Sequence, residues 1–148
     1  MTGKELWNLF IKESNLHEID NSYEAWSFGS EADELALLVT IGIKTATSSA
    51  YPLYELKRES LPLPNVYSVI LDSRGNAVCV IQTTKVEVVP FDKVTAEHAY
   101  REGEGDKSLE HWREVHEKFF TKALNKVGVD FTLDMKVVCE EFEVVYRS

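Results

Sequence analysis

The segment from Gly42 to Ser49 gathers side chains that could do chemistry, with one lysine and four hydroxyl groups in its last six residues. A lysine held among apolar neighbours loses hydration, so its pKa falls and it can act as a base near neutral pH. A threonine hydroxyl becomes a nucleophile when a neighbouring base takes its proton. Lys44 and Thr47 share a face if the backbone is a helical turn, and they point apart in a flat strand. The alternative interpretation is that the hydroxyls cap a turn and Lys44 is an ordinary surface charge.

The composition is typical of a globular chain with a sizeable core. The 148 residues suit one compact domain over 1–148, and 44% hydrophobic with 28% charged residues are ordinary values. No apolar run approaches the length of a membrane span, and the N-terminus has no apolar signal-peptide core. We therefore expect a cytoplasmic protein with no membrane partner. Cys79 and Cys139 lie in apolar runs and are expected to be small buried strand residues, not a disulfide or metal pair.

The net charge of −9 limits the possible partners. Broad, sequence-independent binding to a nucleic-acid backbone needs a cationic surface, so we expect no DNA partner. A pocket for one nucleoside or one exposed base needs only local groups, and the charge leaves that class open.

Periodicity and breaker residues predict alternating blocks of helix and strand. In the first part we expect helices at about Lys4 to Ser14 and, after a capping box at Ser30 to Asp33, at Ser30 to about Thr40. A short helical turn over Ala50 to Lys57 follows. The later elements are strands Val66 to Asp72 and Asn76 to Val89 joined by a hairpin turn, a helix from about Thr95 to Arg101, a helix capped by Ser108 and ended by Gly128, and one or two strands over Lys136 to Tyr146.

Short strands separated by helices predict an α+β fold. The arrangement favours a small barrel or a strongly curved sheet with helices packed on it. A doubly wound parallel sheet is not favoured, because the strands do not alternate regularly with long helices.

Several segments together resemble the ASCH (activating-signal-cointegrator homology) domain family over nearly the whole chain. The matching segments are Tyr23–Gly29, Gly42–Thr47, Val86–Phe91, Glu97–Asp106, Ser108–Glu110, Trp112–Arg113, His116 and Phe119–Phe120. The resemblance implies a PUA-like small β-barrel with helices packed around it.

The chain departs from the family pattern at two places. The family signature Gly-x-Lys-x-x-Thr-x-Arg is matched at Gly42, Lys44 and Thr47, but Ser49 stands where the arginine is expected. Serine cannot hold a phosphate or carboxylate bidentately as arginine can. The residues Asn65–Val66 replace a Gly-Asp pair before the first long strand.

The resemblance implies recognition of RNA or of a nucleoside-like small molecule. One branch of the family is similar to an amidohydrolase that removes the acetyl group from acetylated cytidine, which implies catalytic roles for Lys44, Thr47 and Glu102. A non-catalytic RNA- or nucleoside-binding module is the alternative. Other members are similar to a ribonuclease, so family membership does not fix a reaction.

Under the amidohydrolase interpretation each residue has a task. Lys44 takes the proton of Thr47, Thr47 attacks the amide carbonyl, and Glu102 orients the substrate or carries a proton to the leaving amine. In the alternative, Lys44 pairs with Glu102 and stays charged, which gives a polar binding site or a structural ion pair without catalysis.

The neighbouring hydroxyls and nearby aromatic rings are candidates for the wall of the pocket. The predicted substrate-binding residues are Trp26, Thr45, Ser48, Ser49, Tyr51 and Tyr54. Trp112 falls on an apolar helical stripe and is expected in the core. We expect no cofactor and no metal, because Glu102, Glu104 and Asp106 form no complete ligand pattern and His111 and His116 are five residues apart. His116 is expected to be a partly buried polar partner on its helix.

Overall fold

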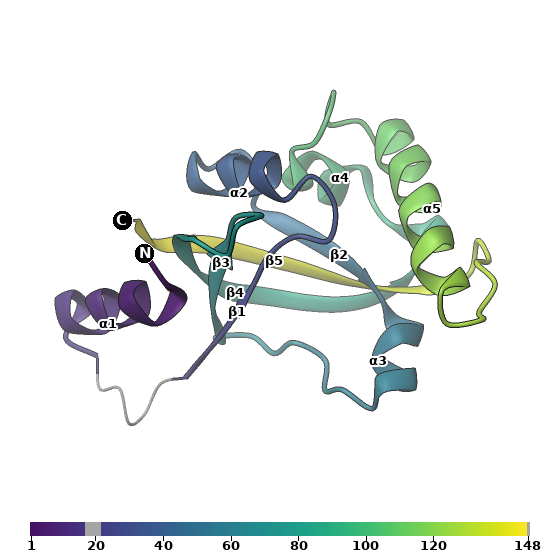
Figure 1. Cartoon of the computed structure of the whole chain (residues 1–148). Coiled ribbons are helices and arrows are strands. Elements are labelled where there is room, and N and C mark those ends of the chain that lie inside the picture. The colour runs from purple at the N-terminus through teal and green to yellow at the C-terminus, as the bar shows by residue number, and fades with distance from the viewer. Residues whose placement is uncertain (17–21, 148) are drawn as a thin grey trace.

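A sheet surrounded by helices forms the centre of the molecule (Figure 1), and the computed structural model describes residues 1–16 and 22–147. The elements, in chain order, are α1 (Gly3–Ser14), β1 (Tyr23–Trp26), α2 (Ala32–Thr40), β2 (Ala46–Ala50), α3 (Tyr51–Lys57), β3 (Tyr67–Leu71), β4 (Ala77–Pro90), the 3-10 helix η2 (Phe91–Lys93), α4 (Ala96–Glu102), α5 (Leu109–Asn125) and β5 (Lys136–Arg147). The expected α+β class is confirmed.

The five strands form one mixed sheet in the order β1-β3-β4-β5-β2. β1 and β3 run parallel, and the other neighbours run antiparallel. Among residues 1–16 and 22–147 no hydrogen-bonded ladder joins the edge strands β1 and β2, so the sheet is open and the expected barrel is not confirmed.

The sheet is nevertheless strongly bent, because its two long central strands are irregular. β4 and β5 pair along most of their length, with register shifts between Val80 and Ile81 and between Thr83 and Lys85. An extra residue in one strand bends it and increases its twist. In the view of Figure 1, the edge strand β1 crosses diagonally in front of β4 and β5.

Two strands were missed by periodicity. The aromatic segment Tyr23–Trp26, which precedes the helix expected from Ser30, forms β1. The motif segment Ala46–Ala50 forms β2, which decides between the strand and the helical turn. Alanine, serine and threonine give little strand signal of their own, and β2 is held by pairing with β5, which is about ninety residues later in the chain.

Helix starts were predicted well where a hydroxyl caps them. Thr95 accepts a hydrogen bond from His98 N, and Ser108 accepts one from His111 N. The capping box expected at Ser30 is wrong, because Glu31 occupies the cap position in a left-handed conformation without a side-chain cap. Asp33 instead accepts hydrogen bonds from the backbone and hydroxyl of Ser73 in the β3–β4 turn.

Three apolar clusters attach the helices to the sheet. α1 packs on Val69 and Val80, α2 packs on Ile70 and Ile81, and α5 packs with η2 on the β5 end that holds Val137. Cys79 and Cys139 are free and buried in these clusters, as the sequence predicted. The α4–α5 side of β2 is therefore covered by helix.

Candidate functional site

β2 divides the Lys-Thr motif between two faces of the sheet. Successive side chains of a strand point to opposite faces. Ser48 contacts Glu102 on the side covered by α4 and α5, whereas Ser49 contacts Tyr54 of α3. Thr47 has the parity of Ser49, so it lies on the face away from Glu102.

On the covered side lies what we call the buried network. Its members are Lys44, Ser48, His98, Glu102, Glu104, Trp112 and His116. Lys44 and Glu102 are each only 1% exposed, which is unusual for charged side chains.

A glycine allows the α4–α5 loop to approach the motif this closely. Gly103 ends α4 with φ of +70°, and a Cβ atom there would come within 2.5 Å of the carbonyl oxygen of Ile43. The backbone N–H of Thr45 donates to the carbonyl oxygen of Arg101 at 2.7 Å in the same contact. This approach brings Glu102 and Glu104 to Lys44.

Both carboxylate oxygens of Glu102 are occupied by protein groups. Oε1 lies 3.3 Å from Lys44 Nζ and 3.4 Å from His116 Nε2. Oε2 accepts hydrogen bonds at 2.5 Å from the Ser48 hydroxyl and from the Trp112 indole, and it lies 2.8 Å from His98 Nε2. With five partners and almost no exposure, this carboxylate has little capacity left for a ligand.

The electrostatics of the network agree with a balanced cluster. Burial acts to raise the pKa of Glu102, but Lys44 and the hydrogen bonds of His116 and His98 hold that pKa well below its usual range. Burial acts to lower the pKa of His116, but the hydrogen bond and charge of Glu102 raise it. With His116 charged, two cations face the two carboxylates of Glu102 and Glu104.

Ser48, His98 and Glu102 form a closed triangle instead of a proton relay. His98 Nε2 lies 2.9 Å from Ser48 Oγ and 2.8 Å from Glu102 Oε2. In a serine–histidine–carboxylate relay, the serine and the carboxylate contact different ring nitrogens. Here Ser48 and Glu102 both contact His98 Nε2, and the Ser48 hydroxyl donates its hydrogen bond directly to the Glu102 carboxylate.

Three ligand-type side chains also converge in the network. Atoms of Glu102, Glu104 and His116 lie within 4.8 Å of one another. Lys44 Nζ lies 3.3 Å and 2.8 Å from the two carboxylates, so an ammonium group already stands where a cation would bind. Asp106, the third member of the acidic run, instead accepts a hydrogen bond from Ser108 N.

The other side of β2 carries a second group of polar side chains, partly exposed except for the buried Thr83, which we call the open face. Its members are Thr47, Ser49, Tyr54, Thr83 and Glu140. Thr47 stands directly opposite Glu140 in the β2–β5 ladder, and directly opposite residues share a face. Ser49 Oγ and Tyr54 Oη are 2.8 Å apart.

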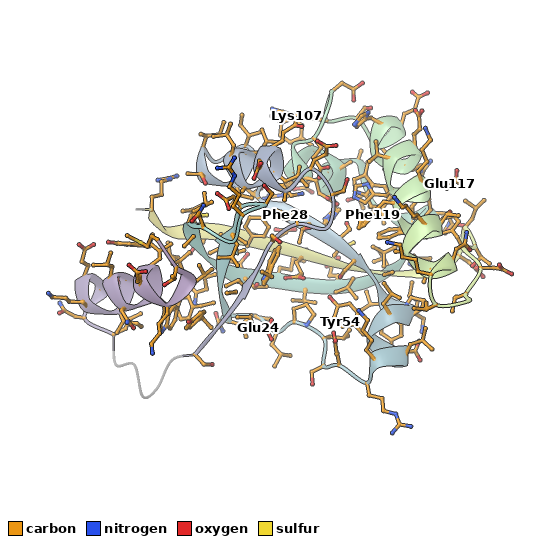
Figure 2. All side chains as sticks on the ribbon, in the orientation of Figure 1. Glu24, Phe28, Tyr54, Lys107, Glu117 and Phe119 are labelled. Atoms are coloured by element: carbon orange, nitrogen blue, oxygen red, sulfur yellow. The ribbon has the colours of Figure 1, made fainter. Side chains whose placement is uncertain are left out.

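Glu140 on β5 lies beside the edge strand β2, and the charge of Glu24 on the other edge strand, β1, also acts on it. Burial raises the pKa of Glu140 to about 7, the Thr83 hydroxyl lowers it, and the charge of Glu24 on β1 raises it again. Burial also raises the pKa of Tyr54, with further contributions from the charges of Glu140 and Glu24. Figure 2 shows Glu24 and Tyr54 both on the lower side of the view, although Glu24 lies on the edge strand β1 and Tyr54 on α3, which follows the opposite edge strand β2.

The remaining predicted site residues are dispersed. Thr45 donates through Oγ1 to the carbonyl oxygen of Arg101 at 3.4 Å. Trp26 packs edge-on against Phe28, with ring centroids 5.0 Å apart, and the Phe28 ring lies 5.4 Å from Lys44 Nζ. Tyr51 lies 5.4 Å from Lys136 Nζ. The structure thus joins Lys44, Ser48 and Glu102, and separately joins Ser49 and Tyr54.

Sequence reasoning missed several polar groups of both faces. His98 and Glu102 are four residues apart, as are Trp112 and His116, and this spacing places each pair on one helical face. This spacing could have predicted the helix pairs of the buried network. The expectation that His116 is a partly buried polar partner is confirmed. Glu140 gave no local signal, because its environment comes from four other strands or helices.

Two hollows lie outside both groups of residues. A cavity of about 140 Å³ beside His98 and Cys139 has a rim of mixed charge that includes Lys85 and Glu141. Burial raises the pKa of the Cys139 thiol to about 12, so this thiol is inert near neutral pH. A larger shallow hollow of about 980 Å³ runs along α5 and contains none of the predicted site residues.

Within residues 1–16 and 22–147, every helix is too short or too polar to cross a lipid bilayer.

Comparisons with known proteins agree on the family. A family model described as the ASCH domain matches residues 24–146. The crystal structure of an ASCH domain from Lactobacillus crispatus is similar, with 30% identity, a TM-score of 0.91, and coverage of 98% of this chain and 94% of that one. A protein from Enterococcus faecalis is 34% identical, with a TM-score of 0.86 and coverage of 97% and 88%. No curated protein matches the chain.

Proposed function

The chain belongs to the ASCH domain family, and we propose that it is a non-catalytic recognition module for a nucleoside or for a single-stranded RNA base. The open face is the surface that receives the ligand. The buried network holds β2, α4 and α5 in place behind it.

One observation carries this proposal: the polar heads expected to act together are separated. A threonine nucleophile needs its base within hydrogen-bond reach. Lys44 contacts Glu102 and Glu104, whereas Thr47 has the parity of the opposite face. Glu102 has five protein partners, which suits a structural support better than a proton carrier.

The open face has the groups that recognition of a base requires. Hydroxyl groups of Thr47 and Ser49 can donate or accept, and Tyr54 adds a phenol. Trp26 lies two residues after Glu24 on β1 and has the same parity, and its partly exposed ring also packs edge-on against Phe28. Aromatic side chains at such sites stack on bases.

Binding can be measured by calorimetry with the four ribonucleosides and with single-stranded RNA hexamers at two salt concentrations. We expect binding of at least one nucleoside and a shallow salt dependence, because a chain of net charge −9 contacts few phosphates. A steep salt slope, or no binding of any probe by a folded sample, would contradict the proposal.

The amidohydrolase is the second candidate, and the Lys44–Glu102 contact at 3.3 Å favours it, since two of its three implied catalytic residues meet. Its test is turnover of acetylated cytidine and related amides, with RNA cleavage assayed on the hexamers in parallel. The binding module predicts no turnover above buffer. Turnover that Thr47→Ala and Lys44→Ala each abolish would establish the amidohydrolase instead.

A further inference from the structure

Glu140 is a carboxylate in an unusual position on the open face. Its side chain is only partly exposed, yet in the described part of the chain no lysine or arginine nitrogen lies within 4.0 Å of it. Burying a charge without a cation partner is costly. The raised pKa of this carboxyl, about 7, expresses that cost.

The groups around Glu140 are hydroxyls and a second acid. Thr47 stands opposite it on β2, and Thr83 reaches it from β4. The charged or titratable groups whose field reaches it are Glu24 on β1 and Tyr54 on α3. Such surroundings leave the Glu140 oxygens as acceptors that lack a strong donor.

The contrast with Glu102 shows which carboxylate is available to a ligand. Glu102 has five protein partners and 1% exposure. Glu140 has the Thr83 hydroxyl and a partly exposed side chain. An incoming N–H group would gain a charge-assisted hydrogen bond at Glu140 and would find no vacancy at Glu102.

We infer that Glu140 determines the specificity of the open face by accepting a hydrogen bond from the exocyclic amino group of a nucleobase. This inference rests on the proposed function for the class of ligand. A glutamate accepts well from the N4 amino group of cytosine. Uracil presents a carbonyl oxygen at the same position, and two acceptors facing each other repel. The face therefore favours cytosine over uracil.

The matched pair of variants is Glu140→Gln and Glu141→Gln. Both remove one charge from adjacent residues of β5. Glu141 points to the other side, where its carboxylate lies 3.8 Å from Arg101 and 4.0 Å from Lys85. Unfolding curves of both variants check that they are folded.

The experiment measures dissociation constants for cytidine and uridine, and for oligocytidine and oligouridine hexamers, at pH 6 and pH 8. The wild type should prefer cytidine by about tenfold at pH 8, where the Glu140 carboxyl is ionised, and less at pH 6. Glu140→Gln should abolish both the preference and its pH dependence, and Glu141→Gln should keep both. The nucleoside and hexamer arms identify whether the free nucleoside or the RNA base is bound.

Each result decides something. An unchanged cytidine preference in Glu140→Gln, an equal loss in Glu141→Gln, or nucleoside binding without any preference would overturn the inference and leave the proposed function in place. No binding of any probe by the wild type would overturn both.

Discussion

Glu102 and Glu140 are two carboxylates on opposite sides of one small sheet, and their pKa values are shifted in opposite directions. Glu102 is almost fully enclosed, yet Lys44, His116 and His98 outweigh the effect of burial and keep its pKa low. Glu140 is less enclosed, yet its pKa rises to about 7 because burial acts without a cation partner. The comparison shows that the donors around a buried acid, more than its depth, decide whether it is a structural support or a group left for a ligand.

The family motif crosses the same boundary. Lys44 belongs to the buried network and Thr47 to the open face, because three residues of spacing at the start of a strand do not keep two side chains on one side. The residues of one sequence motif are thus divided between the buried network and the open face.

The strongest way to test the comparison is to make the same substitution on both faces. Glu102→Gln should lower the free energy of unfolding by about 3–5 kcal/mol, because it leaves buried cations without their partner. Glu140→Gln at pH 8 should leave it unchanged or raise it, because an unpaired charge is removed. Urea unfolding monitored by tryptophan fluorescence measures both. Equal losses in the two variants would remove the distinction between the faces.

Removing a single hydrogen bond should likewise cost more stability in the buried network than on the open face. Trp112→Phe removes the indole donor at 2.5 Å from Glu102 and should cost about 1–3 kcal/mol, since a buried acceptor loses a partner. Tyr54→Phe removes a partly exposed phenol and should cost less than about 1 kcal/mol.

A double-mutant cycle between Trp112→Phe and Glu102→Gln separates the hydrogen bond from lost ring packing. A coupling energy of zero in that cycle would show that Trp112 stabilises the core by packing alone.

The pH dependence of stability should carry opposite signs from the two acids. The folded-state pKa of Glu140 lies above its unfolded value, so its contribution is present at low pH and is lost as the pH rises from about 4.5 to about 7. Glu102 has a lowered pKa, so its contribution is present above about 4.5 and is lost as the pH falls. Glu140→Gln should remove a decline on the order of 1–2 kcal/mol between pH 5 and pH 8.

The control for that experiment is Glu141→Gln, which should keep the decline. A wild-type stability that rises steadily from pH 5 to pH 8, with no difference in Glu140→Gln, would contradict the raised pKa of Glu140.

Local signals predicted much of this fold. The cap residues Thr95 and Ser108 start helices because their hydroxyls satisfy nearby backbone N–H groups, and the hairpin after Asp72 forms because its carboxylate accepts from Arg74 N and Asn76 N. The family resemblance predicted that Lys44 and Glu102 belong to one site, and their side-chain nitrogen and oxygen lie 3.3 Å apart.

The rest depended on contacts between distant parts of the chain. β2 is a strand because β5 supplies its hydrogen-bond partners, and the residues Ala46–Ala50 alone do not predict that pairing. Asp33 does not take part in the expected helix cap and instead accepts hydrogen bonds from Ser73, forty residues later in the chain. Glu140 acquires its environment only in the folded sheet, where Glu24 of β1 and Tyr54 of α3 act on or respond to its charge. Periodicity describes one element at a time and carries no information on such pairings.

Ser48 and Ser49 offer the most direct test of the central claim, because they are adjacent, chemically identical and on opposite faces. The measurement is the cytidine dissociation constant of Ser48→Ala and Ser49→Ala, each beside its free energy of unfolding. Ser48→Ala removes a donor to Glu102 and should lower stability by about 1–3 kcal/mol while binding stays within about twofold of wild type. Ser49→Ala should weaken binding by about fivefold or more with a smaller loss of stability, since its hydroxyl lies on the open face beside Tyr54. Weakened binding in Ser48→Ala together with unchanged binding in Ser49→Ala would contradict the account and place the ligand on the side of Lys44 and Glu102.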